Sequence, residues 1–218
     1  MNKKILISTG GSGGHVVPAT ILYEHLKDDF KVYMTSDERG TQFLNKQKYD
    51  IKIINTPKIS ILFLLPFQIL LISYLIIKSL VFLKDKKIDL IISTGGYMSL
   101  PLCVASKILN TKIFLFEPNM VLGRTNKLFL KFSEKIFCYS DKIKKFPDEF
   151  KNKILIIPAL LRKEFYNIKK NSDFSENINL LIIGGSQRAK LFDTAIKDSI
   201  IQLSKKYKLK IFQQTNLN

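Results

Sequence analysis

The sequence has little cysteine, and its two cysteines form no metal-binding pattern. Cys103 and Cys138 are the only cysteines among 218 residues, and no CxxC or other metal-ligand spacing is present. We therefore expect no bound metal and a reducing cytosolic compartment. The N-terminal stretch MNKKILIST lacks the long apolar region and the cleavage site of a signal peptide.

Acidic residues are also scarce. The chain has 18 Asp and Glu against 35 Lys and Arg, a formal net charge of +17. Such an excess favours an anionic partner, which could be nucleic acid, an anionic membrane or a phosphorylated substrate. A compositional bias of the genome is the alternative explanation. The chain has no recognition-helix motif and no aromatic-rich basic sheet, so we expect no nucleic-acid partner.

Short apolar runs alternate along the chain with stretches of helical apolar spacing. Apolar residues make up 46% of the sequence, which excludes a disordered chain. The alternation predicts an α/β fold with a doubly wound parallel sheet and helices on both faces. The expected strands are Lys4–Ser8, Lys31–Thr35, Lys52–Asn55, Asp89–Thr94, Lys112–Phe116, Lys135–Tyr139 and Lys153–Ile157, and the expected helices are Pro18–Lys27, Pro101–Leu109 and Arg124–Phe132.

A polar segment then interrupts this pattern, which starts again after it. We interpret 163–178 as a linker between a first domain at 1–162 and a second at 179–218. A single strand–helix–strand unit cannot bury its own sheet, so the second domain is expected to be incomplete. Its expected elements are a strand at Asn179–Ile183, a glycine loop, a helix ending near Lys206 and a strand at Lys208–Gln213.

The stretch TGGSGGHVVPA (Thr9–Ala19) places four glycines between the first strand and a helix. Glycines let the backbone approach a ligand closely, and a helix start offers free N–H groups that suit a phosphate or diphosphate. Neither the dinucleotide fingerprint GxGxxG nor the P-loop GxxxxGK[ST] fits the stretch. Glycine pairs also end strands at Gly95-Gly96 and Gly184-Gly185, and the carboxyl edge of an open α/β sheet is where ligands bind. A tight turn without a ligand is the alternative.

Four motifs, in this order, resemble those of the MurG family of peripheral membrane glycosyltransferases. They are TGGSGGHVVPA, STGGYMSLP, FEPNMVLGRTNKL and IIGGSQRAK, and the resemblance extends over essentially the whole chain. It implies a GT-B fold of two Rossmann-like domains, of which the donor-side domain, from residue 179, is truncated here. It also implies an inverting hexosyltransferase that needs no cofactor. The implied reaction moves N-acetylglucosamine from UDP-GlcNAc to lipid I, the undecaprenyl-diphosphate-linked N-acetylmuramoyl-pentapeptide, and so forms lipid II for peptidoglycan.

The resemblance also assigns site residues. His15 is implied as the catalytic group that orients the acceptor or takes its hydroxyl proton, and imidazole is a suitable base. A histidine that only bonds the loop is the alternative. The family motif around Glu117 has histidine and glutamine where this chain has Phe116 and Pro118. The implied substrate-binding residues are Ser12, Gly13, Gly14, Gly95, Gly96, Tyr97, Glu117, Asn119, Arg162 and Ser186.

The segment Ile59–Ile77 has 19 residues without a charge, and lysines follow it. By length it could span a membrane, but it lies between two strands of one α/β pattern and contains Pro66. We expect residues 59–84 to lie on an anionic membrane surface instead, with the lysines at the headgroups. A buried core helix and a true span are the alternatives.

The resemblance therefore implies a peripheral protein at the cytoplasmic face of the bacterial inner membrane. Its implied partners are UDP-GlcNAc, lipid I, the membrane surface and divisome or other cell-wall synthesis proteins. Two alternatives stay open: an inactive remnant that binds lipid or membrane, and a different GT-B transferase with another lipid acceptor.

Overall fold

A computed structural model describes residues 3–45, 47–57, 65–167, 177–183 and 196–214. The chain divides into two compact units, Met1–Asn167 and Ile168–Asn218, which are described separately below. The proposed linker at 163–178 contains a short helix at its start and the first residues of a strand at its end.

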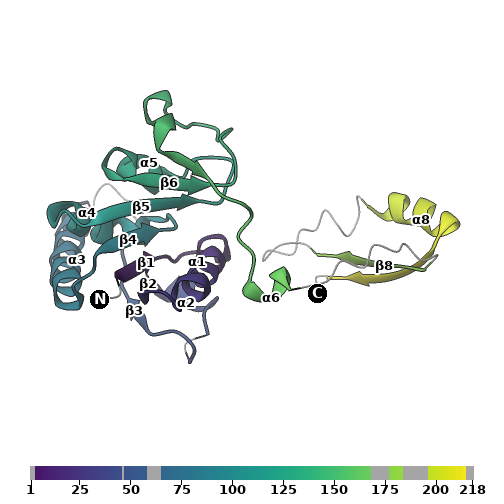
Figure 1. Cartoon of the computed structure of the whole chain (residues 1–218), viewed down its shortest axis with the longest axis horizontal. Coiled ribbons are helices and arrows are strands. Elements are labelled where there is room, and N and C mark those ends of the chain that lie inside the picture. Colours follow the sequence, from purple (N-terminus) through teal and green to yellow (C-terminus); the bar gives the residue numbers. More distant parts are fainter. Residues whose placement is uncertain (1–2, 46, 58–64, 168–176, 184–195, 215–218) are drawn as a thin grey trace. The chain divides into compact units, whose positions relative to one another are not determined.

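A seven-stranded parallel sheet forms the centre of the first unit, in the order β3-β2-β1-β4-β5-β6-β7 (Figure 1). All seven strands expected in this unit are present, with ends that differ by at most about two residues. The strands are β1 Lys4–Ser8, β2 Lys31–Ser36, β3 Ile51–Ile53, β4 Leu90–Ser93, β5 Lys112–Glu117, β6 Lys135–Cys138 and β7 Ile154–Ile156.

Helices cover both faces of this sheet, which explains why the middle residues of its central strands are apolar on both sides. The helices are α1 Gly13–Leu26, α2 Glu38–Thr41, α3 Leu65–Lys86, α4 Leu100–Ile108, α5 Arg124–Phe129 and α6 Lys163–Tyr166, with 3-10 turns at Tyr97–Ser99, Leu130–Phe132 and Asp148–Lys153.

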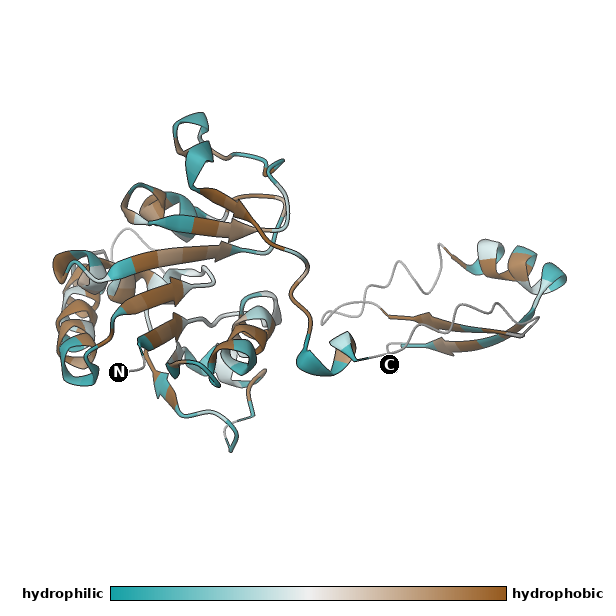
Figure 2. Cartoon of the chain, in the orientation of Figure 1, coloured by the Kyte–Doolittle hydropathy of each residue, from teal (hydrophilic) through white to brown (hydrophobic). Residues whose placement is uncertain are grey.

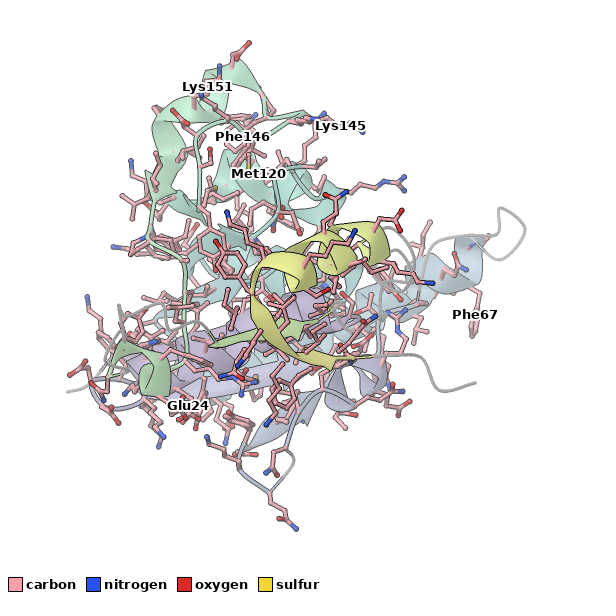
Figure 3. All side chains as sticks on the ribbon, turned by 90° about the vertical axis from the view of Figure 1, so that its right-hand side faces the viewer. Glu24, Phe67, Met120, Lys145, Phe146 and Lys151 are labelled. Atoms are coloured by element: carbon pink, nitrogen blue, oxygen red, sulfur yellow. The ribbon has the colours of Figure 1, made fainter. Side chains whose placement is uncertain are left out.

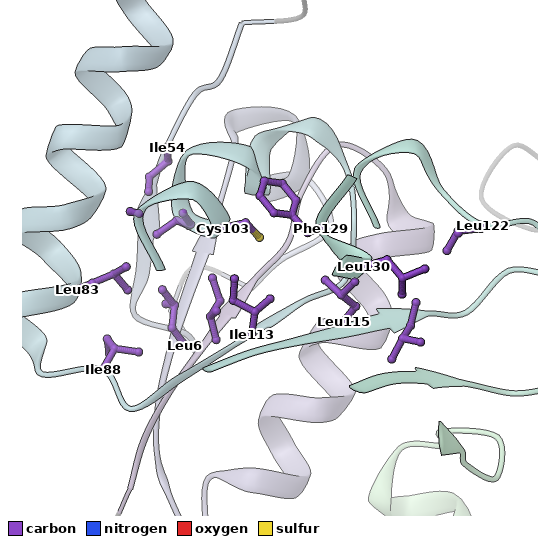
Figure 4. Close-up of a cluster of buried hydrophobic side chains, with 14 of the residues drawn as sticks. Leu6, Ile54, Leu83, Ile88, Cys103, Ile113, Leu115, Leu122, Phe129 and Leu130 are labelled. Carbon is purple, nitrogen blue, oxygen red and sulfur yellow. The ribbon is translucent and has the colours of Figure 1, made fainter. Parts of the chain in front are cut away.

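Successive residues of β1 face opposite sides of the sheet. Leu6 is fully buried in the core cluster that α3, α4 and α5 share, which Figure 4 shows with Leu83, Cys103 and Phe129. Ile5 and Ile7 instead pack in the cluster that includes Ala19 of α1. The period-2 alternation of a strand thus assigns neighbouring residues to two cores.

Helix α1 starts five residues before its predicted first residue, Pro18. The helix begins at Gly13, after the extended residue Ser12. The prediction placed the start too late because it followed the apolar spacing, whereas glycines carry no such signal. Both glycines of the second pair, Gly13 and Gly14, therefore belong to the first turn of the helix.

Helix α3 is mostly hydrophobic (Figure 2), and its apolar residues lie on two opposite faces. Ile72, Leu75 and Leu83 are buried against the unit. Leu70 and Val81 lie on the other face and are 70% and 63% exposed. By length and composition alone, Pro66–Lys86 could cross a membrane. Of the most apolar 18-residue stretch of this helix, 22% is buried. The helix therefore contributes to the core and also presents an apolar surface.

The second unit contains two parallel strands and a helix within its described residues. Strand β8, Asn177–Ile182, pairs with β9, Lys208–Gln213, and α8, Lys197–Lys206, precedes β9. These elements are the strand–helix–strand pattern expected from the sequence. The glycine loop predicted at Gly184-Gly185 lies outside the described residues.

Candidate functional site

The site lies at the carboxyl edge of the sheet, between β1 and β4. These two strands are hydrogen-bonded neighbours, and the chain leaves them in opposite directions, since β2 lies beyond β1 and β5 lies beyond β4. Such a switch in strand order opens a crevice in doubly wound folds. The first two glycine loops both start here, as the sequence predicted.

The first glycine loop has a backbone that only glycine adopts easily. Gly10 and Gly11 have φ angles of 147° and 79°. A side chain on Gly10 would place its Cβ 2.5 Å from Oδ1 of Asp37. The loop therefore packs directly on the carboxylate that follows β2.

Asp37 fixes this loop through hydrogen bonds. Its Oδ1 accepts from the N–H groups of Gly11 at 2.7 Å and Gly40 at 2.9 Å, and its Oδ2 accepts from Nε and Nη2 of Arg39. Burial by itself raises the pKa of Asp37, but these donors outweigh it and hold the pKa below its ordinary value.

We expect Asp37→Ala to destabilise the protein by about 2–4 kcal/mol, because the buried N–H of Gly40, the partly buried N–H of Gly11 and a guanidinium lose their acceptor. The measurement is the free energy of unfolding from urea titration. Asp29→Ala is the matched control, since Asp29 is exposed and follows α1. A loss equal to that of the control would contradict the role given to Asp37.

The second glycine loop holds the ring of His15. Nδ1 of His15 lies 2.7 Å from the carbonyl oxygen of Thr94. A carbonyl can only accept, so Nδ1 carries the proton and Nε2 of the neutral ring keeps a lone pair. Gly95 has a φ of 90°, and a Cβ there would lie 3.3 Å from Cε1 of His15. The loop thus needs glycine both for its conformation and for space beside the imidazole.

A cleft of about 370 Å³ opens beside these loops. Ile72 of α3 forms part of its wall. The cleft brings together residues that are far apart in the sequence, including five of the predicted site residues: His15, Gly95, Gly96, Tyr97 and Glu117. The other lining residues are Thr56, Pro57, Ile72, Leu100, Gly123, Arg124, Thr125 and Asn126.

Glu117 organises the loop that closes one side of the cleft. The carboxylate is 2% exposed and accepts from the N–H and Nδ2 of Asn119, the N–H of Gly123 and Nδ2 of Asn126, at 2.8–3.2 Å. Asn119 uses its amide in this network and is not among the residues that line the cleft. Phe116, at the position of the family's histidine, is buried in the core.

The remaining predicted residues lie elsewhere. Ser12 directly precedes α1 and Gly14 is exposed in its first turn. Gly13 is buried, and a Cβ built on it would lie 3.3 Å from the ring of Phe43. Ser186 lies outside the described residues. Arg162 lines a different cavity of about 470 Å³, along α1.

The Arg162 cavity contains a compact ion cluster. Oε2 of Glu24, on α1, lies 2.7 Å from Nζ of Lys27, and Oε1 lies 3.0 Å from Nζ of Lys48 (Figure 3 labels Glu24). Burial raises the pKa of Glu24, but the hydrogen bonds from Lys27, Lys48 and Tyr49 dominate and lower it to about 2.

This shift predicts a pH dependence of stability. A depressed carboxyl pKa stabilises the fold above the unfolded pKa, about 4.5, and this contribution disappears as the pH falls towards 2. We expect Glu24→Gln to cost about 1–2 kcal/mol at pH 7, discounted because both lysines are partly exposed, and almost nothing at pH 2. Urea unfolding at both pH values measures this difference. A cost that is equal at both would refute the proposed ion cluster.

Sequence reasoning missed Asp37, Arg39 and Asn126. Asp37 follows a buried strand at the carboxyl edge, which is a usable signal, but its partner Gly11 is 26 residues away. Asn126 lies on α5 and donates to Phe116 and Glu117. Among the described residues, no group of three or more His, Cys, Asp or Glu could hold a metal ion.

Comparisons with known proteins identify the family of the chain. Residues 5–138 match the model of the glycosyltransferase family 28 N-terminal domain. The chain is 63% identical to the UDP-N-acetylglucosamine--N-acetylmuramyl-(pentapeptide) pyrophosphoryl-undecaprenol N-acetylglucosamine transferase of Pelagibacter ubique, over 99% of this chain and 61% of that protein. It is 33% identical to the protein of the same name from Rickettsia canadensis, over 99% and 62%. The chain thus spans about three fifths of the length of these relatives.

Solved structures show the same fold. The MurG structure from Acinetobacter baumannii superposes with a TM-score of 0.69 at 24% identity, covering 97% of this chain and 58% of that one. A UDP-GlcNAc 2-epimerase from Neisseria meningitidis superposes with a TM-score of 0.61 at 15% identity, covering 99% and 66%. Both matches support the Rossmann-like α/β architecture of the GT-B type. Because the family model covers more than half of the chain, the chain belongs to glycosyltransferase family 28 and contains the N-terminal domain of that family.

Proposed function

We propose that this chain acts in the transfer of N-acetylglucosamine from UDP-GlcNAc to undecaprenyl-diphosphate-linked N-acetylmuramoyl-pentapeptide, the step that makes lipid II. The observation that carries the proposal is the 63% identity, over 99% of this chain, to a relative named for this transfer. The cleft beside His15 supports it, because it combines an imidazole with the second glycine loop near the switch point of the sheet.

In the proposed mechanism, the muramoyl sugar enters the cleft and its 4-hydroxyl lies at Nε2 of His15. The imidazole takes the hydroxyl proton while the oxygen forms a bond to the anomeric carbon of the donor sugar. The bond from that carbon to the diphosphate breaks, UDP leaves with the electron pair, and the anomeric configuration inverts. Thr94 holds the ring in the tautomer that can accept this proton.

Helix α3 supports docking of the same unit on a membrane. Its exposed face carries Phe67, Leu70 and Ile77, and Phe67 projects outward in Figure 3. Ile72, on the opposite side of α3, lines the cleft, so a lipid tail in the bilayer and a sugar in the cleft would be close together. We therefore propose a peripheral position at the cytoplasmic face of the inner membrane, near divisome or other cell-wall synthesis proteins.

Transfer of labelled N-acetylglucosamine to a short-chain lipid I analogue tests the proposal. The chain is assayed alone and together with the donor domain of a full-length relative. We expect turnover in at least the second mixture, and none when the donor domain is assayed without this chain. Absence of turnover in both mixtures, with binding of the acceptor analogue intact, would instead favour a lipid-binding protein without activity.

A further inference from the structure

Arg39 contacts Tyr97, which lines the cleft, and its guanidinium is held from two sides. Its Nε and Nη2 donate to Oδ2 of Asp37 at 3.0 and 2.9 Å, and Nη2 also donates to the hydroxyl of Tyr97. The guanidinium carbon lies 5.1 Å from the centre of the Tyr97 ring. These contacts join the turn after β2 to the second glycine loop and fix the direction of the guanidinium.

Part of this guanidinium remains available to a ligand. The Arg39 side chain is 53% exposed, whereas that of Asp37 is 6% exposed. Among the described residues, no hydrogen bond uses Nη1 of Arg39, so its two N–H groups are free to donate. A Cβ built on Gly11 would lie 3.8 Å from Nη2, which places the guanidinium directly beside the first glycine loop.

The free N–H groups of Arg39 suit a phosphate group. The two N–H groups of Nη1 can donate to phosphate oxygens, and preorganisation by the Asp37 carboxylate reduces the entropy that the guanidinium loses on binding. The net charge of +17 favours binding of an anion. The N–H groups at the start of α1, which also suit a phosphate, belong to the same glycine loop. The guanidinium of Arg39 therefore lies beside the loop at which a diphosphate would bind.

We propose that Arg39 binds the diphosphate of a substrate, with Asp37 and Tyr97 as its positioning residues. This inference rests on the proposed function and deepens it. Two substrates of that reaction carry a diphosphate: the lipid-linked acceptor and the nucleotide sugar. Arg39 belongs to the unit whose cleft contains His15, and the test below distinguishes the two sources.

The test measures dissociation constants of the full chain for three probes. They are a short-chain lipid I analogue, the matching muramoyl-pentapeptide 1-phosphate without the second phosphate, and UDP-GlcNAc. The variants are Arg39→Ala and Arg39→Lys. The lysine variant keeps a cation beside Asp37, so that its effect on binding can be read even if the alanine variant does not fold. Lys112→Gln is the control for net charge, because Lys112 is exposed at the first residue of β5, on the opposite edge of the sheet.

We expect Arg39→Ala to weaken binding of the lipid I analogue about 10–100-fold, and Arg39→Lys to do so by a smaller factor. The wild-type preference for diphosphate over monophosphate should disappear in Arg39→Ala. Weakened binding of UDP-GlcNAc instead would support the same role with the donor as the source. Equal weakening of both acceptor probes would overturn the inference, because it indicates a structural role. If the wild type binds no acceptor probe, the proposed acceptor site fails and the inference fails with it.

Discussion

Replacing His15 by asparagine should lower the rate of sugar transfer by about 10²–10⁴-fold, the usual contribution of a general base. Asparagine is the informative substitution because its Nδ2 can replace Nδ1 of histidine as the donor to Thr94, at 2.7 Å in the native protein. The loop then keeps its hydrogen bond, and only the basic Nε2 is lost. We expect the dissociation constant of the acceptor analogue and the free energy of unfolding to change little.

His25→Gln is the matched control for this experiment. His25 is the second of the two histidines, and its Nε2 bonds the carbonyl oxygen of Leu161, outside the cleft. Glutamine preserves a donor at that position, so transfer should stay within about twofold of the wild type. The assay is the labelled transfer to a short-chain lipid I analogue, with the donor domain added where turnover needs it. Transfer by His15→Asn within tenfold of the wild type would exclude His15 as the base.

The sequence was sufficient to predict the sheet of the first unit because its central strands are buried on both faces. The run KILIS of β1 has three consecutive apolar residues at its centre, and such runs are distinct from the amphipathic segments around them. The four-residue helix α2 escaped prediction, since Glu38–Thr41 carries no apolar periodicity. Its position depends on Asp37, which accepts from Gly40.

The candidate site was predicted only in part, because its geometry depends on contacts between distant segments. The glycine pairs predicted the loops, but the bond from His15 to Thr94 joins residues that are 79 positions apart. The link from Arg39 to Tyr97 spans 58 positions. Glu117 lines the cleft, and nothing in the sequence indicated that its carboxylate also accepts four hydrogen bonds from Asn119, Gly123 and Asn126.

The combined substitution Phe67→Gln, Leu70→Gln and Ile77→Gln should weaken binding to anionic vesicles by about 100-fold or more. The three side chains are 67%, 70% and 60% exposed, so their transfer into the interface would contribute about 3–5 kcal/mol in total. Glutamine is a good helix former, and these positions lie outside the core, so the unfolding temperature should change little. Sedimentation with phosphatidylglycerol-containing vesicles measures the binding.

Two further variants separate this proposal from a general attraction between a basic protein and an anionic surface. Leu155→Gln with Ile156→Gln removes exposed apolar side chains from β7 and should leave vesicle binding unchanged. Lys78→Glu with Lys84→Glu, both exposed on α3, should reduce binding at low salt by about 1 kcal/mol or more per charge. If the lysine variant loses binding while the triple glutamine variant does not, the attraction is electrostatic and the apolar face of α3 does not enter the bilayer. Loss in both variants, with the β7 variant intact, would place the mouth of the cleft at the membrane surface, because Ile72 connects α3 to that cleft.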